Sequence, residues 1–246
     1  MKVLLIGDSC EDRYFYGDVK RLNPEAPVPI LEYKRGVTSK GMVWNVRENL
    51  RSFGVEVYTS THPEEIIKTR YIDEKSNQQI MRYDVEPKIE PLSFDFPPEW
   101  NNLYDALVIS DYNKGFLTTE KIFELTSRFV GPVFIDSKKT NLPADAYIKV
   151  NELEYERMAY CNYENLIITR GGEGAEYKGD LYPAEKVNVF DVVGAGDTFL
   201  AALTYGYLKY GRIDKAIPLA NKAASIAVSH RGTYVLKEED VTKILH

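Results

Sequence analysis

The sequence predicts an α/β fold with a mostly parallel central sheet flanked by helices. Short apolar runs bounded by turn residues recur along the chain, as expected for strands that are buried on both faces. Helix-like segments separate several of these runs, so strand and helix alternate as in a parallel sheet. The predicted strands are residues 3–6, 106–109, 132–135, 148–150 and 166–169, and the predicted helices between them include 119–129 and 152–160.

Two segments break this alternation. Residues 27–35 and residues 68–84, the latter folded about Lys75-Ser-Asn77, have the pattern of antiparallel β-structure. We therefore expect a small β lid, formed by segments of about 13–38 and 66–86, within one domain that spans residues 1–246.

The last third of the chain is predicted to be helical. Apolar residues recur at helical spacing over 198–209 and 214–229. Pro218 falls in or just after the first turn of the second of these helices, where a missing N–H is tolerated.

Composition limits the classes of function. The 246 residues carry 31 Lys and Arg against 37 Asp and Glu, and this net charge of −6 comes without a basic block that would attract nucleic acid. The first apolar run ends at Gly7 and Asp8, far short of a signal sequence or a membrane span, so we expect a cytoplasmic protein without membrane association. Cys10 and Cys161 are expected to be buried thiols, and the three histidines lack the spacing of a metal site.

The sharpest local feature is a glycine-rich turn, Asp191-Val-Val-Gly-Ala-Gly-Asp197, that opens directly into an Ala- and Leu-rich segment. The N–H groups of Gly194, Ala195 and Gly196 would point along a helix N-terminus, where the macrodipole favours a phosphate. Asp197 would stand beside that anion and accept a proton from an attacking hydroxyl, while the amides stabilise the charge on the transferred phosphoryl group. The alternative is a tight turn in which Asp197 is only a helix N-cap.

Further short motifs lie along nearly the whole chain. They are Ile6-Gly-Asp8, Asp12-Arg-Tyr14, Pro24-Glu-Ala-Pro-Val-Pro29, Asn45 nine residues before Gly54, Asn77-Gln-Gln-Ile-Met-Arg82-Tyr-Asp84, Ser110-Asp-Tyr-Asn-Lys-Gly115, Asp136-Ser-Lys138, Asn151-Glu-Leu-Glu154, Thr169-Arg-Gly171 followed by Gly174, Asn221-Lys-Ala-Ala224 and Arg231-Gly-Thr233. In this order the motifs resemble those of the ribokinase family of carbohydrate kinases (PfkB type), and most closely those of its heptose 7-phosphate kinases.

The resemblance implies a ribokinase-like fold and an ATP-dependent carbohydrate kinase that uses Mg²⁺, with Asp197 and the amides of residues 194–196 as its catalytic groups. The implied substrate residues are Asp12, Gly41, Asn45 and Asp111. The implied nucleotide residues are Lys138, Asn151, Glu154, Thr169, Gly171, Gly174, Asn221 and Ala224, with Glu154 holding the water shell of the metal. Taken alone, each of these residues has the alternative of a solvated polar side chain or a cap, and assistance by a monovalent cation stays open.

Three cationic residues fall on the predicted lid strands. Lys68, Arg70 and Arg82 would converge on an anionic group of the substrate, which favours a sugar phosphate over a free sugar. The alternative is the charged outer face of an exposed hairpin, in which Glu74 and Asp84 serve as salt-bridge partners.

Tyrosines are plentiful on the same segments. Tyr14, Tyr16 and Tyr33 would pack in a lid-to-lid interface, where Tyr is favoured, so a homodimer is a further hypothesis.

The chain also departs from the family pattern at three places. Gly41-Met42-Val43-Trp44 stands where the family has two glycines and small residues, which adds bulk beside the sugar. Residues 54–58 lead almost directly into a lid strand, so one strand-helix-strand segment should be shorter than the family norm. Val192 stands where the family usually has Thr, which removes a hydroxyl group near the site.

These departures leave a second class of function open. In it the chain is a non-catalytic relative that binds a sugar phosphate or a nucleotide, and Met42 and Trp44 fill the former substrate pocket. A dehydrogenase of the Rossmann type is disfavoured, because the residues after the first strand, Gly7-Asp-Ser-Cys10, lack the required glycine spacing.

Overall fold

The computed structural model describes residues 1–94, 96, 98–158 and 163–246. The chain forms two compact units, and the path passes between them four times. The larger unit contains residues 1–8, 42–62 and 89–246, and the smaller unit contains residues 9–41 and 63–88. Cys161, predicted to be a buried thiol, lies outside the described residues, whereas Cys10 is buried as expected.

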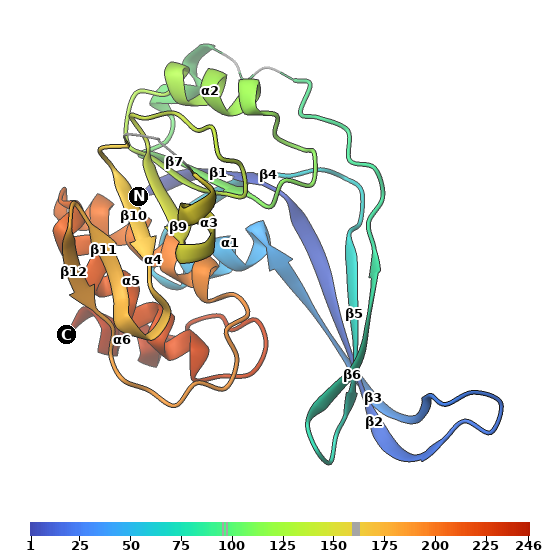
Figure 1. The fold of residues 1–246 in the computed structure, drawn as a ribbon. Helices are drawn as coiled ribbons and strands as arrows, with labels where there is room; N and C mark the ends of the chain where they lie inside the picture. The colour runs from blue at the N-terminus through green and yellow to red at the C-terminus, as the bar shows by residue number, and fades with distance from the viewer. Residues whose placement is uncertain (95, 97, 159–162) are drawn as a thin grey trace. The chain divides into compact units, whose positions relative to one another are not determined.

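An eight-stranded sheet forms the centre of the larger unit (Figure 1). Its strands stand in the order β12-β11-β10-β9-β8-β7-β1-β4, and all neighbours from β10 to β4 pair in parallel, which confirms the predicted architecture. The last two strands, β11 and β12, add an antiparallel edge. The bounds are β1 Lys2–Gly7, β4 Glu56–Ser60, β7 Ala106–Asp111, β8 Val133–Ser137, β9 Tyr147–Asn151, β10 Leu166–Thr169, β11 Gly174–Tyr177 and β12 Asp180–Pro183.

Helices cover both faces of this sheet: α1, α4 and α5 lie on one side and α2 on the other (Figure 1). Alternate residues of each inner strand point to opposite faces, so Val3 and Leu5 join the core beneath α1 and α4. The helices α4 and α5 pack closely, because Gly206 lets the backbone of Ala216 approach. The helical bounds are α1 Val43–Ser52, α2 Thr119–Arg128, α3 Glu152–Arg157, α4 Ala195–Tyr210, α5 Ile213–Val228 and α6 Glu238–Leu245, with 3₁₀ turns η1 Pro98–Asn102 and η2 Gly171–Glu173.

The predicted helices differ from the observed ones mainly at their ends. Helix α4 begins at Ala195 rather than at 198, because Gly194 adopts a left-handed conformation and starts the helix directly after the glycine-rich turn. Helix α3 ends at Arg157, and the predicted end of this helix at residues 159–160 lies outside the described residues. Pro218 lies inside α5, just after its first turn, as the sequence predicts.

The smaller unit is a four-stranded sheet with the order β3-β2-β5-β6. The bounds are β2 Ser9–Leu22, β3 Pro29–Met42, β5 Ile67–Asp73 and β6 Gln78–Val85. Strands β5 and β6 form the predicted antiparallel hairpin, whereas β2 and β5 pair in parallel, a pairing that the sequence did not indicate. The predicted lid segments, 13–38 and 66–86, fall within this unit, and their role as a lid stays a prediction.

In the part of the chain that the structure describes, no helix combines the length and the apolar character that a membrane span requires.

Candidate active site

The glycine-rich turn forms the N-terminus of α4. Gly194 is the N-cap residue with φ 78°, and the first helical residue is Ala195. An ideal Cβ on Gly194 would lie 2.6 Å from Nδ2 of Asn45, so this position needs glycine for both its conformation and its space. Asp191 holds the turn from the other side, since its carboxylate accepts hydrogen bonds from the backbone N–H groups of Val193 and Gly232 at 3.0 and 2.9 Å. The amides of residues 194–196 therefore stand at a fixed helix N-terminus, where an anion is favoured.

Asp197 is not a helix N-cap, which corrects the alternative prediction. The N-cap is Gly194, and the Asp197 side chain instead makes hydrogen bonds to other elements. The Tyr112 hydroxyl donates to Oδ1 at 2.7 Å, and Nδ2 of Asn45 donates to Oδ2 at 3.2 Å. The carboxylate thus lies between the loop after β7 and helix α1, and Asp197 is only 3% exposed.

The pKa of Asp197 is raised to about 6. Burial is the largest cause, because desolvation disfavours the charged form, and the nearby carboxylate of Asp136 adds to it. The hydrogen bonds from Tyr112 and Asn45 and the charge of Lys149 act in the opposite direction. A carboxylate with this pKa is ionised at neutral pH yet basic enough to take a proton from a hydroxyl group, as a general base requires.

A second layer of amides orients Asn45. Nδ2 of Asn49, one turn later on α1, donates to Oδ1 of Asn45 at 3.0 Å, which leaves the Asn45 amide nitrogen to face Asp197 and the carbonyl of Gly194. Oδ1 of Asn49 accepts a hydrogen bond from the backbone N–H of Leu236. The contact of Asn45 with a sugar stays a prediction, but the structure places this residue directly on the candidate base.

A cavity of about 700 Å³ opens beside the N-terminus of α4, and its size lies within the range of small-molecule sites. Every nucleotide residue implied by the family resemblance lies on its wall except Glu154. Its lining combines these residues, the turn and an apolar segment: Tyr112, Asp136, Lys138, Lys149, Asn151, Glu152, Leu153, Thr169, Gly171, Gly172, Gly174, Ala184, Glu185, Lys186, Val187, Val189, Val192, Gly194, Ala195, Gly196, Phe199, Asn221, Ala224, Ser225 and Val228.

Lys138 and Lys149 bring positive charge to the part of this cavity beside the glycine-rich turn. Lys149 is 4% exposed and forms an ion pair with Asp136 at 2.5 Å, and an ideal Cβ on Gly196 would lie only 2.8 Å from its Nζ. Lys138 forms an ion pair with Glu154. Burial lowers the pKa of Lys138, but Asp136, Glu154 and Asp197 outweigh that cause and the net direction is upward, so Lys138 stays charged. Both ammonium groups can therefore bind phosphate oxygens beside the amide cradle.

Glu154 lies next to the cavity as part of a helix cap. It forms a capping box with Asn151 at the start of α3, in which each side chain accepts a hydrogen bond of 2.9 Å from the other residue's backbone N–H. Among the described residues no group of three or more His, Cys, Asp or Glu side chains is placed to hold a metal ion. A single carboxylate fits Mg²⁺ that keeps most of its water and binds chiefly through substrate phosphates.

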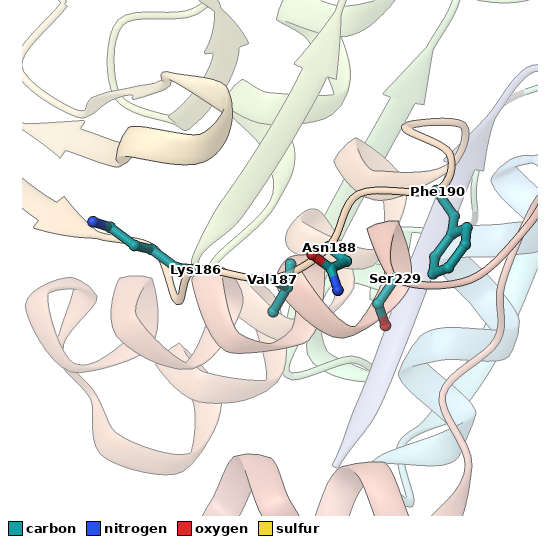
Figure 2. Close-up of a pocket in the computed structure, with 5 residues that line it drawn as sticks. All are labelled: Lys186, Val187, Asn188, Phe190 and Ser229. Atoms are coloured by element: carbon teal, nitrogen blue, oxygen red, sulfur yellow. The ribbon is translucent and has the colours of Figure 1, made fainter.

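A second hollow, of about 550 Å³, lies on the segment that leads to the glycine-rich turn (Figure 2). Lys186 and Val187 line both cavities, and Asn188, Phe190 and Ser229 complete this one. In Figure 2 the Lys186 side chain points away from the other four.

The implied substrate residues of the smaller unit share one face of its sheet. Asp12 forms an ion pair of 2.5 Å with Arg70, and Gly41 leaves room for it, since a Cβ there would lie 2.4 Å from the Asp12 carboxylate. Arg82 stands opposite Arg70 and forms an ion pair of 2.6 Å with Asp84, which lowers the pKa of that carboxyl group. The pair of Arg82 with Asp84 is one that the alternative prediction, a charged outer face of an exposed hairpin, names.

Other residues of the smaller unit agree less well with the sequence predictions. Glu74 pairs with Arg35 and Lys34 rather than with the three predicted cations. Lys68 stands opposite Asp12 and Asp84 in the strand register. Convergence of the three cations on a substrate phosphate stays a prediction.

Asp111 belongs to the larger unit and is 1% exposed. Its carboxylate accepts hydrogen bonds from the Ser137 hydroxyl at 2.5 Å, from Lys139 at 2.8 Å and from the backbone N–H of Asn113 at 3.0 Å. It therefore holds the loop after β7 in place, and its contact with the sugar stays a prediction.

Sequence reasoning missed two residues of the site. Tyr112 lies within the motif at residues 110–115, which by itself indicates no role for the tyrosine, although its hydroxyl donates to the candidate base. Lys149 lies in a predicted strand, where the apolar pattern hides it. The signal was available, because a lysine in the middle of a strand that is buried on both faces needs a charged partner or a ligand.

Comparison with known proteins identifies the family. A model of the pfkB family of carbohydrate kinases matches residues 140–240. The "Bifunctional protein HldE" of Helicobacter acinonychis (strain Sheeba) is 30% identical over 308 aligned positions, which cover 100% of this chain and 66% of that protein. The chain therefore spans slightly less than two thirds of this relative, and the alignment, longer than the 246 residues of the chain, contains segments that this chain lacks.

Two solved structures share the fold. Phosphofructokinase-2 from Escherichia coli in complex with potassium superposes with a TM-score of 0.74 at 17% identity, covering 98% of this chain and 97% of that one. Arabidopsis thaliana ribokinase complexed with ribose and ATP superposes with a TM-score of 0.70 at 15% identity, covering 99% and 98%. The fold is thus ribokinase-like, as the sequence predicts. Together with the family model and the full-length alignment, it assigns this chain to the pfkB family of carbohydrate kinases.

Proposed function

We propose that the protein transfers the terminal phosphoryl group of ATP to a hydroxyl group of a sugar phosphate, most closely of the heptose 7-phosphate type. The observation that carries the proposal is the placement of Asp197, a buried carboxylate with a raised pKa, at a glycine-rich helix N-terminus. The same N-terminus opens on a cavity whose lining includes Lys138 and Lys149. A base, an anion cradle and phosphate-binding cations are the groups that phosphoryl transfer needs.

In the proposed reaction Asp197 accepts the proton of the attacking hydroxyl as the new O–P bond forms. The amides of residues 194–196 stabilise the charge on the transferred group, since they are fixed before the reaction begins. Lys138 and Lys149 bind phosphate oxygens of the nucleotide from the side of β8 and β9. A bound Mg²⁺, whose water shell Glu154 would hold, would neutralise charge on the phosphates.

The nucleotide is proposed to extend from the amide cradle to the apolar part of the cavity. Val187, Val189 and Ala224 line this part, and Asn221 is fixed beside them by donating to the carbonyl of Tyr182 at 2.7 Å. The open space around Gly171, where an added Cβ would meet nothing within 4 Å, suits a loop that approaches the phosphates.

The finer choice of a heptose phosphate rests on the relatives named HldE and on the cationic face of the smaller unit. Arg70 and Arg82 would bind the phosphate of the sugar, in exchange for part of their present pairing with Asp12 and Asp84. Homodimerisation through the exposed Tyr33 region, a cytoplasmic location and assistance by a monovalent cation belong to the same proposal. Tyr14 is buried within the smaller unit and is therefore not proposed for the interface.

The test is coupled ADP release with ATP, Mg²⁺ and a panel of sugar phosphates that includes heptose 7-phosphate and fructose phosphates. Asp197→Asn serves as the blank for contaminating kinases and should lower kcat by roughly 100- to 10,000-fold, with nucleotide affinity retained. Absence of turnover by the wild type with every acceptor, combined with ATP binding by calorimetry, would instead support a non-catalytic binding protein. An unchanged kcat in Asp197→Asn would refute the assignment of the base.

A further inference from the structure

Tyr112 has a position that the proposed reaction does not yet explain. It follows Asp111 at the carboxyl end of β7, and its hydroxyl donates to Oδ1 of Asp197 at 2.7 Å across 85 residues of sequence. Its side chain also lines the cavity, and Nζ of Lys138 lies 5.5 Å from the centre of its ring. The residue therefore contacts both the candidate base and one of the candidate phosphate ligands.

The loop that carries Tyr112 is held rigidly. The buried carboxylate of Asp8, at the end of β1, accepts hydrogen bonds from the backbone N–H groups of Tyr112 at 2.7 Å and Lys114 at 3.2 Å. Asn113 between them has φ 57°, and its N–H donates to Asp111. A loop with three side-chain-to-backbone bonds presents its tyrosine at one fixed place, which is what the orientation of a catalytic group requires.

We propose that Tyr112 is a positioning residue of the phosphoryl transfer, whose hydroxyl fixes the orientation of the Asp197 carboxylate and favours its ionised form. The catalytic meaning of this role depends on the proposed function, whereas the physical role does not. Two donors fix the carboxylate, because Tyr112 donates to Oδ1 and Asn45 donates to Oδ2. The carboxylate therefore cannot rotate without losing both hydrogen bonds.

Other charges also face Asp197, and they set the background against which Tyr112 acts. Asp136 raises its pKa, Lys149 lowers it, and the positive charge of Lys138 interacts with it as well. Removal of the phenol oxygen leaves all three in place. A change in titration after that removal would therefore report the hydrogen bond itself.

The direct test is a ¹³C NMR titration of the Asp197 carboxyl carbon in the free protein, with the signal assigned by its loss in Asp197→Asn. We expect the midpoint near pH 6 in the wild type and about one pH unit higher in Tyr112→Phe, since a donor to the charged form is lost. Tyr234→Phe is the matched control, because Tyr234 also donates to a carboxylate at 2.7 Å, that of Asp240, away from the cavity lining. Its Asp197 midpoint should equal that of the wild type.

A second variant keeps the test valid if Tyr112→Phe folds poorly. Placing 3-fluorotyrosine at position 112 retains the ring and the hydrogen bond but makes the phenol a stronger donor, so the Asp197 midpoint should move to lower pH. Equal Asp197 midpoints in the wild type, Tyr112→Phe and the 3-fluorotyrosine protein would overturn the inference.

The kinetic arm separates this inference from the proposed function. With a sugar phosphate that the wild type phosphorylates, the acid limb of the plot of kcat against pH should move to higher pH in Tyr112→Phe, by the same number of pH units as the NMR midpoint. A structural defect alone would lower kcat at every pH without moving the limb, and that result would count against the positioning role. If the wild type has no turnover, the proposed function fails, while the NMR titration still decides whether Tyr112 controls Asp197.

Discussion

The ionised carboxylate of Asp197 should lower the unfolding free energy at neutral pH, compared with the same protein carrying a neutral side chain at this position. The pKa of Asp197 is about 6 in the folded protein against an ordinary value of 3.8. The folded state then binds the proton more tightly than the unfolded state, so stability from this group is full below pH 3.8 and is lost as the pH rises to 6. A difference of 2.2 pH units corresponds to about 3 kcal/mol of unfolding free energy.

The variant Asp197→Asn isolates this cost. Asparagine keeps both hydrogen bonds, because its oxygen can accept from Asn45 while its amide donates to the hydroxyl oxygen of Tyr112. We therefore expect the variant to gain about 3 kcal/mol over the wild type at pH 8, a rise in Tm of about 6 to 12 °C, and well under about 1 kcal/mol at pH 4.

Thermal unfolding of both proteins from pH 4 to pH 8 measures the difference, and only its change with pH is used. The control is Asp214→Asn, since Asp214 pairs with Arg212 at the surface and its pKa is lowered. That variant should lose a little stability, and more of it at pH 8 than at pH 4. A difference between Asp197→Asn and the wild type that stays constant over this range, or that grows toward acid, would refute the reasoning about the buried carboxylate.

Three more outcomes are expected. Gly174→Ala should lower the unfolding free energy by at least about 3 kcal/mol, because φ is 112° and the new Cβ would lie 2.0 Å from a backbone oxygen of β12. Gly179→Ala also has a positive φ but adds its Cβ to open space, so it should lower the unfolding free energy by less. Thermal melts compare the two variants. Lys149→Met leaves Asp136 buried without its cation and should lower the unfolding free energy by about 3 to 5 kcal/mol. The double variant with Asp136→Leu should recover most of this free energy in the same melts. An equal loss in the double variant would contradict the ion-pair argument. Glu154→Gln should raise the Mg²⁺ concentration for half-maximal activity by about 10-fold and lower the Tm only slightly, because glutamine keeps the capping box but loses the ion pair with Lys138. An unchanged Mg²⁺ dependence would exclude Glu154 from the metal's surroundings.

The elements of the sheet could be predicted from sequence because their signal is local. Each inner strand of the larger unit is an apolar run between turn residues, and each run that was singled out forms a strand. The predicted start of this helix, Thr198, lies three residues after the observed start of α4 at Ala195, because the left-handed conformation of Gly194 begins the helix directly after the turn. Local patterns thus located the elements, and glycine conformation decided one of their ends.

The site could be predicted only in part, because its contacts join distant segments. The glycine-rich turn at residues 191–197 predicts an anion-binding helix N-terminus from local sequence alone. Nothing near Asn45 in sequence indicates that it meets Asp197, 152 residues later, or that Tyr112 meets the same carboxylate. Charge partners were equally hidden, since Lys138 pairs with Glu154 from another element.

Met42, which stands where the family pattern has a glycine, has a backbone conformation that its residue type did not predict. Met42 is the N-cap of α1 with φ 58° and ψ −127°, a conformation that glycine adopts freely and methionine does not. The backbone at position 42 therefore has a conformation suited to the glycine of the family pattern, although the side chain here is methionine. The Met42 side chain is buried, which offsets part of the strain.

The fourfold passage of the chain between the two units has a consequence for folding during synthesis. The smaller unit is complete once residue 88 has been made, whereas β1 pairs with β7 across more than 100 residues and the larger unit needs segments up to the C-terminus. Long-range parallel pairing forms slowly, because the entropy of loop closure must be offset before the contacts are gained. We therefore expect the nascent chain to assemble the four-stranded sheet first, while the edge of β1 that pairs with β7 stays unpaired until β7 has left the ribosome.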